Sequence, residues 1–280
     1  MYSTLISAQE LNALPPHSVV IFDCRFDLQR PNAGREQYDK GHIPKAFYLD
    51  LNLDLSSWPS KAEGRHPLPN FTEFKEIMSQ SGVLPDKQVV CYDDSGGCYA
   101  ARAWWLIKAL GVENVAVLNG GYSHWQELGF DADRRSPPPQ TGKISAVEWM
   151  LPIVAAQEVH AMINSSERVL VDARESARFA GVAEPIDPYA GHIPSACNVY
   201  WKEGLNAEGG FASPQALQKR WQDYNPDNTV HYCGSGVTAC FNVLSHTIAS
   251  GKVPALYVGS WSQWCGLYPE QIAQCTEQSA

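Results

Sequence analysis

Short apolar runs alternate with longer amphipathic stretches along most of the chain. Residues 89–92 and 116–118 are apolar and rich in β-branched side chains, and they predict buried strands. Residues 71–79 and 100–110 predict helices. Strands that alternate with helices in this way are typical of a parallel sheet covered on both faces. The pattern therefore predicts an α/β fold.

The same pattern occurs twice. Residues 19–25 read VVIFDCR and residues 168–174 read RVLVDAR, so each apolar run ends in Asp-x-Arg. The sequence Gly-His-Ile-Pro follows in each half, at residues 41–44 and 191–194. Because the histidines His42 and His192 recur in both halves, we expect them to support the fold rather than to bind a metal or catalyse a reaction.

Two further segments continue the series in the same order. Residues 89–96 (VVCYDDSG) correspond to residues 229–236 (TVHYCGSG), and GGYSHW corresponds to a later GSWSQW. An ordered series of this kind indicates that one folding unit was duplicated. Three consecutive prolines favour an extended connection between the halves. We expect two domains, at residues 1–135 and 153–280, joined by a linker at residues 136–152.

Composition and charge exclude several classes of partner. The chain has 280 residues, of which 44% are hydrophobic, and its formal net charge is -9. Nucleic acids and acidic membranes both require a concentrated basic face, which this sequence lacks. The first 14 residues do not resemble a secretion signal, and no run of 18 apolar residues occurs. We therefore expect a soluble protein of the cytoplasm.

The candidate chemistry lies in a loop that begins with Cys233. Eight cysteines without a Cys-x-x-Cys pair are too few for a disulfide scaffold, and most are expected to be buried thiols. Ligands of parallel sheets bind beyond the carboxyl ends of the strands. In the second half, the residue directly after the predicted strand at 229–232 is Cys233.

The residues after Cys233 suit an anion on sulfur. Gly234 and Gly236 allow a tight turn whose N–H groups point inward, and a helix is expected over residues 237–248. The positive end of that helix favours negative charge on a nearby sulfur, so we expect a thiolate that is a competent nucleophile and a persulfide that is stabilised in the same place.

Three other interpretations of this loop fit the sequence less well. Cys233 could be one more buried cysteine, but its position in a glycine-containing turn after a strand disfavours that reading. Gly234, Gly236 and Ala239 fit a dinucleotide fingerprint, which requires an acidic residue at the end of the next strand; residues 256–259 supply none. A cysteine phosphatase would need arginine where Ala239 stands.

The loop CGSGVTA, the paired Gly-His-Ile-Pro motifs, Asp-Ala-Arg and the GSWSQW segment resemble tandem rhodanese-domain sulfurtransferases over essentially the whole chain. The loop is similar to that of the family members that use 3-mercaptopyruvate, whereas members that use thiosulfate usually carry basic residues directly after the cysteine. The resemblance implies a non-catalytic first domain. Asp93 stands there at the position of Cys233 and cannot carry sulfur, so we expect it to be a surface carboxylate or a hydrogen-bonding carboxylate of the loop.

The resemblance also implies a set of site residues. Arg178 matches an arginine that holds the substrate carboxylate, and Ser235 and His66 match groups that handle protons. The sequence departs from the pattern at Ile186, where the family has a second arginine, and at Asn52, where it has an aspartate; Asp50 and Asp54 are nearby. We expect Arg65, next to His66, to supply the missing cation. The remaining expected substrate-binding residues are those of the loop itself: Gly234, Gly236, Val237 and Thr238.

The expected reaction has two steps. The Cys233 thiolate takes sulfur from a small donor and passes it to a thiol or to cyanide, with thioredoxin as a further candidate acceptor and with no need for a metal or an organic cofactor. Since the loop residues supply only backbone donors, the sequence favours 3-mercaptopyruvate over the doubly charged thiosulfate. Two alternatives stay open: a thiosulfate:cyanide sulfurtransferase, and a non-catalytic rhodanese-like module that relays sulfur between proteins or binds a partner.

Overall fold

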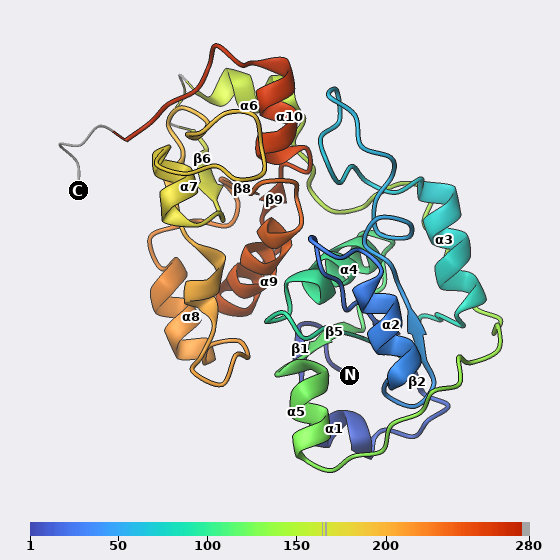
Figure 1. Ribbon diagram of the computed structural model, residues 1–280. Helices are drawn as coiled ribbons and strands as arrows, with labels where there is room; N and C mark the ends of the chain where they lie inside the picture. Colours follow the sequence, from blue (N-terminus) through green and yellow to red (C-terminus); the bar gives the residue numbers. More distant parts are fainter. Residues whose placement is uncertain (164, 166, 276–280) are drawn as a thin grey trace. The chain divides into compact units, whose positions relative to one another are not determined.

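The structure, a computed structural model, describes residues 1–163, 165 and 167–275. The chain divides into two units. The first contains residues 1–57, 68–151 and Leu205–Phe211, and the second contains Trp58–Pro67, Pro152–Gly204 and the chain from Ala212 onward. Each unit therefore includes one short segment that comes, in sequence, from within the other half (Figure 1).

The first unit is built on a parallel sheet that, within the described residues, has the order β1-β5-β4-β2-β3. Its strands are β1 (Leu5–Ile6), β2 (Val19–Asp23), β3 (Ala46–Tyr48), β4 (Gln88–Tyr92) and β5 (Val115–Leu118). Its helices are α1 (Ala8–Ala13), α2 (Ala33–Lys40), α3 (Phe71–Gln80), α4 (Cys98–Ala109) and α5 (Gly121–Glu127).

The second unit repeats this topology with the order β7-β6-β8-β9 over the part of the chain that is described. Its strands are β6 (Val169–Asp172), β7 (Cys197–Asn198), β8 (Thr229–Tyr232) and β9 (Ala255–Leu256). Ile153 forms a parallel bridge with Leu256, at the edge where β1 lies in the first unit. Its helices are α6 (Ala156–Met162), α7 (Ser176–Ala180), the 3-10 helix η1 (Trp201–Gly204), α8 (Pro214–Trp221), α9 (Thr238–Ser250) and α10 (Ser260–Leu267).

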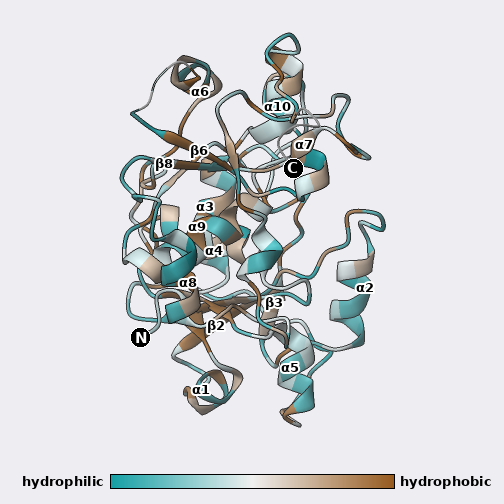
Figure 2. Ribbon diagram, turned by 90° about the vertical axis from the view of Figure 1, so that its left-hand side faces the viewer, coloured by the Kyte–Doolittle hydropathy of each residue, from teal (hydrophilic) through white to brown (hydrophobic). Residues whose placement is uncertain are grey.

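Both faces of each sheet are covered by apolar contacts, as the continuous apolar strands require. In the first unit, Ile21 and Val90 pack with side chains of α1 and α5, and α4 packs along β4 and β5. In the second unit, Val230 packs with α6 and α10, whereas Val171 belongs to a separate cluster with α8. Figure 2 shows β2, β6 and β8 among the most hydrophobic parts of the chain. The predicted α/β fold with parallel sheets is confirmed.

The repeated motifs hold the sheet to the loop that follows α2 or α7. In the first unit, the hydroxyl of Tyr92 donates to Asp23 Oδ2 (2.7 Å) and accepts from the N–H of Ile43 in the Gly-His-Ile-Pro segment (3.2 Å). The imidazole Nδ1 atoms of His42 and His192 lie 2.8 Å from backbone carbonyl oxygens of the preceding helices. These histidines thus have the structural role expected from their repetition. No described helix has the length and apolar character needed to cross a membrane.

Candidate active site

The backbone of Cys233 is fixed on both sides by hydrogen bonds. Cys233 directly follows β8, and only 2% of its surface is exposed. Its N–H donates to Ser260 Oγ (3.1 Å), and its carbonyl oxygen accepts from the N–H of Trp261 at the start of α10 (3.0 Å). The N–H of Gly236 donates to the sulfur atom itself at 3.2 Å. The thiol is therefore held in a turn with a backbone donor directed at it.

Gly236 is required by the shape of this turn. Its φ angle of +79° lies in the left-handed region, and a Cβ atom at this position would lie 2.3 Å from the carbonyl oxygen of Val258. The turn leads directly into α9, which has 13 residues and begins at Thr238 with Val237 at its N-cap. The N-terminal end of a helix stabilises negative charge on a nearby sulfur.

The matching loop of the first unit shows how such a turn binds an anion. The carboxylate of Asp93 accepts four backbone hydrogen bonds of 2.7–2.8 Å, from the N–H groups of Ser95, Gly97, Tyr99 and Ala100. Burial raises the pKa of Asp93, and these four donors oppose that effect. An Asp93 oxygen is one bond beyond Cγ, as the outer sulfur of a persulfide is one bond beyond the Cys233 sulfur. The repeated loop is therefore a nest for a negative group at that distance from the backbone.

The predicted serine and histidine lie together. His66 Nδ1 is 2.7 Å from Ser235 Oγ, and both residues are buried. His66 reaches this position because the segment Trp58–Pro67 belongs to the second unit. Asn52 belongs to the first unit, where its side chain is exposed and its N–H donates to Asp50 Oδ1 (2.8 Å).

Two guanidinium groups converge on the residue after the cysteine. A Cβ atom placed on Gly234 would lie 3.1 Å from Arg65 Nη2 and 3.5 Å from Arg178 Nη2. The backbone N–H of Arg65 donates to Ser262 Oγ (3.0 Å), which fixes its segment against α10. Ile186, at the position where the family pattern has arginine, is 49% exposed. The structure thus places the guanidinium of Arg65 next to Gly234, and its role in substrate binding stays a prediction.

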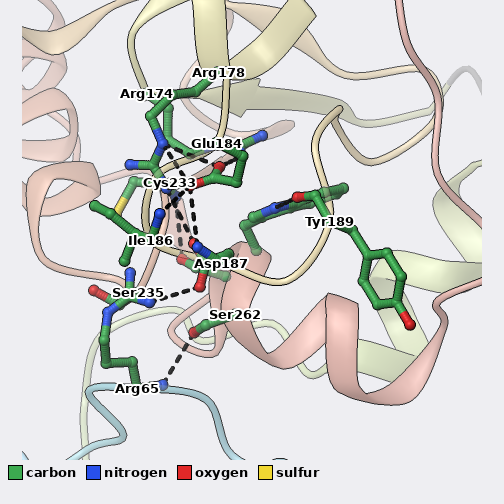
Figure 3. Close-up of polar contacts among 12 residues, drawn as sticks. Arg65, Arg174, Arg178, Glu184, Ile186, Asp187, Tyr189, Cys233, Ser235 and Ser262 are labelled. Atoms are coloured by element: carbon green, nitrogen blue, oxygen red, sulfur yellow. Dashed lines mark hydrogen bonds and ion pairs between the residues drawn. The ribbon is translucent and has the colours of Figure 1, made fainter. Parts of the chain in front are cut away.

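Sequence reasoning did not identify the acidic partners of these arginines. Asp187 accepts from Arg65 Nη1 at 2.6 Å and from Arg178 Nη2 at 3.0 Å, and Glu184 accepts from Arg178 Nη2 at 2.7 Å (Figure 3). Burial raises the pKa of Glu184, but hydrogen bonds from Arg178 and from the Asp187 N–H outweigh it, so the net pKa lies below the ordinary value. The only sign of these partners in the sequence was that both acids lie close to Ile186, where the family pattern has arginine. The segment around them is otherwise typical of a polar loop.

The two copies of the α/β unit have the same loop after the central strand, with cysteine in one copy and aspartate in the other. This is the arrangement of a tandem sulfur-transfer protein. The rhodanese-like domain matches this chain twice, at residues 7–128 and 155–267. The chain therefore belongs to the rhodanese family, which confirms the predicted family and its two-domain fold.

Relatives that align with most of this chain are named sulfurtransferases. A protein of Pseudomonas aeruginosa described as a probable 3-mercaptopyruvate sulfurtransferase is 39% identical and is aligned over 93% of this chain and 94% of its own length. A thiosulfate sulfurtransferase of Rattus norvegicus is 29% identical over 88% of this chain and 85% of its own. The crystal structure of the 3-mercaptopyruvate sulfurtransferase SseA from Escherichia coli has a TM-score of 0.79 at 29% identity, with 93% and 100% of the two chains covered. The predicted enzyme class, a sulfurtransferase, is confirmed.

Proposed function

We propose that this protein transfers sulfur from 3-mercaptopyruvate to a thiol or to cyanide through a persulfide on Cys233. The observation that carries the proposal is the convergence of Arg65 and Arg178 on Gly234, next to the buried thiol. Two guanidiniums directed at one point suit a planar carboxylate, which 3-mercaptopyruvate carries next to its carbonyl group. The naming of relatives as 3-mercaptopyruvate sulfurtransferases supports this choice of donor.

In the first step, the Cys233 thiolate attacks the sulfur of the donor, the carbon–sulfur bond breaks, and its electron pair leaves as the enolate of pyruvate. A proton on the enolate gives pyruvate. Ser235 and His66, whose side chains are 2.7 Å apart, are the groups that deliver this proton. The persulfide loses its own proton. Its negative charge is stabilised by the Gly236 N–H and by the N-terminal end of α9.

In the second step, a thiolate or cyanide attacks the outer sulfur, the sulfur–sulfur bond breaks, and the Cys233 thiolate is restored. A dithiol protein such as thioredoxin is a candidate acceptor, because its second thiol would displace the transferred sulfur as sulfide. Sulfide release on addition of reduced thioredoxin tests that acceptor. We keep the cytoplasm as the proposed compartment, because eight cysteines without a Cys-x-x-Cys pair are too few for a disulfide scaffold.

A direct test is the mass of the intact protein after incubation with each donor. We expect a gain of one sulfur atom with 3-mercaptopyruvate, which is absent in Cys233→Ser and is retained in the matched control Cys240→Ser. Arg178→Ala and Arg65→Ala should raise the KM for 3-mercaptopyruvate at least tenfold, whereas Arg30→Ala, whose side chain is 73% exposed, should not change it. A sulfur gain that persists in Cys233→Ser would refute the assignment.

Thiosulfate is the second candidate donor, because relatives of this chain are named thiosulfate sulfurtransferases and two arginines also attract a dianion. Turnover of both donors with cyanide, side by side, distinguishes them. A higher kcat/KM for thiosulfate would replace 3-mercaptopyruvate in the proposal. Turnover of neither donor, with Cys233 intact, would favour a module that relays sulfur between proteins.

A further inference from the structure

We propose that Asp187 is a specificity-determining residue, which keeps the donor site neutral and so favours singly charged donors over doubly charged ones. This inference rests on the proposed function, because it concerns the site that would hold the donor carboxylate. The donors differ in charge: 3-mercaptopyruvate is a monoanion, and thiosulfate is a dianion. The observations that carry the inference are the position of Asp187 between the two arginines and the balance of charges around them.

Asp187 connects the two guanidiniums that face Gly234. One carboxylate oxygen accepts from Arg65 at 2.6 Å and the other from Arg178 at 3.0 Å, and the Asp187 side chain is only 2% exposed. The hydrogen bonds to Asp187 involve Nη1 of Arg65 and Nη2 of Arg178, whereas the atom nearest to Gly234 is Nη2 of Arg65. The carboxylate therefore holds both groups, and the atoms that do not bind it, Nη2 of Arg65 and Nη1 of Arg178, would lie 3.1 and 3.6 Å from a Cβ placed on Gly234, next to Cys233.

The charges around the site are balanced only when Asp187 is counted. Glu184 binds Arg178 and also Arg174 (Figure 3). Arg174 in turn binds Asp172. Three guanidiniums thus face three carboxylates, all of them largely buried except for the outer parts of Arg65 and Arg178. The connected set consists of Arg65, Arg174, Arg178, Asp172, Glu184 and Asp187.

Removal of one negative charge at this position should affect the two donors unequally. The Coulomb energy between a ligand and an added positive charge is proportional to the charge of the ligand. The gain in binding free energy for a dianion is therefore about twice that for a monoanion. The factor by which the dianion's affinity rises is then about the square of the factor for the monoanion. If Asp187→Asn strengthens monoanion binding about fivefold, it should strengthen dianion binding about 25-fold.

The experiment measures anion binding without turnover. Alkylation of Cys233 by iodoacetamide, a neutral reagent, is followed by mass spectrometry in the presence of pyruvate or sulfate at constant ionic strength. We expect Asp187→Asn to strengthen protection by sulfate at least fivefold more than protection by pyruvate. Asp187→Glu keeps the charge, and Asp223→Asn makes the same change in net charge at an exposed residue, so both should keep the wild-type ratio within twofold.

A second variant covers the case in which Asp187→Asn does not fold. Ile186 directly precedes Asp187 in the chain and is half-exposed, so Ile186→Arg adds a positive charge without removing a member of the network. It should shift the sulfate-to-pyruvate ratio in the same direction. An unchanged ratio in a folded Asp187→Asn or, failing that, in Ile186→Arg overturns the proposal, as does an equal shift in Asp223→Asn. Failure of the proposed function would instead be seen as wild-type Cys233 that gains no sulfur from either donor.

Discussion

Two histidines in the second unit are buried as neutral rings, and their hydrogen bonds fix their tautomers. His246 Nε2 lies 3.1 Å from the carbonyl oxygen of Tyr224, which can only accept, so this nitrogen carries the proton. His246 Nδ1 is therefore the acceptor for His231 Nε2, 3.2 Å away. The indole of Trp221 stacks on His246 with ring centroids 4.8 Å apart. A proton added to either ring would bring a charge into this buried cluster, and on His231 that charge would also be repelled by Arg220.

This arrangement predicts a loss of stability in weak acid. Burial lowers the pKa of His246 to about 4 and lowers that of His231 well below its ordinary value. Between pH 6.5 and pH 4 the unfolded chain binds a proton at His246 and the folded chain does not, so the free energy of unfolding falls as the pH falls. For pKa values of 6.5 and about 4, the loss from pH 7 to pH 5 is about 2 kcal/mol for His246, and His231 adds a loss of the same sign.

The variant His246→Gln isolates the effect, because glutamine can donate to Tyr224 and accept from His231 but does not titrate. Hydrogen exchange of peptides from β8 and α9, corrected for the intrinsic rate at each pH, gives the free energy of opening of this region. We expect the wild type to lose about 2 kcal/mol more than His246→Gln between pH 7 and pH 5. Equal losses in the two proteins would refute the reasoning, whatever their difference at pH 7.

Two further predictions concern the anion-binding loops. Gly236→Ala places a Cβ 2.3 Å from the Val258 carbonyl oxygen, so it should lower the free energy of unfolding by more than the roughly 1–2 kcal/mol that a left-handed alanine costs. The control Gly251→Ala, with φ +75° and no atom within 4 Å of the added Cβ, should cost only that amount. Thermal unfolding compares the two variants, and equal losses of stability would contradict the close contact. Asp93→Ala leaves four N–H groups without their acceptor, two of them at the buried residues Tyr99 and Ala100, and should destabilise the first unit by about 3 kcal/mol or more in urea unfolding. A loss no larger than that of the exposed Asp39→Ala would show that water replaces the carboxylate.

The sequence alone identified the duplication and the chemistry at Cys233, because both are local properties. The apolar strands at 89–92 and 229–232, the glycines around Cys233 and the contrast with Asp93 lie within short windows of the chain, where hydrophobic periodicity and turn residues determine the backbone. The family resemblance added Ser235, His66 and Arg178 as site residues. Their roles in the reaction are predictions that the experiments above test.

Only the tertiary structure determined the electrostatics of the site. Arg65 and Asp187 are 122 residues apart in the chain, and nothing in a polar segment such as Glu-Pro-Ile-Asp shows that its acids are buried. The neutral loop suggested by the sequence is accompanied by two guanidiniums from elsewhere and by the carboxylate that joins them. Charge interactions depend on distance and burial, and both arise when the chain folds, whereas the pattern of apolar residues is fixed in the sequence itself.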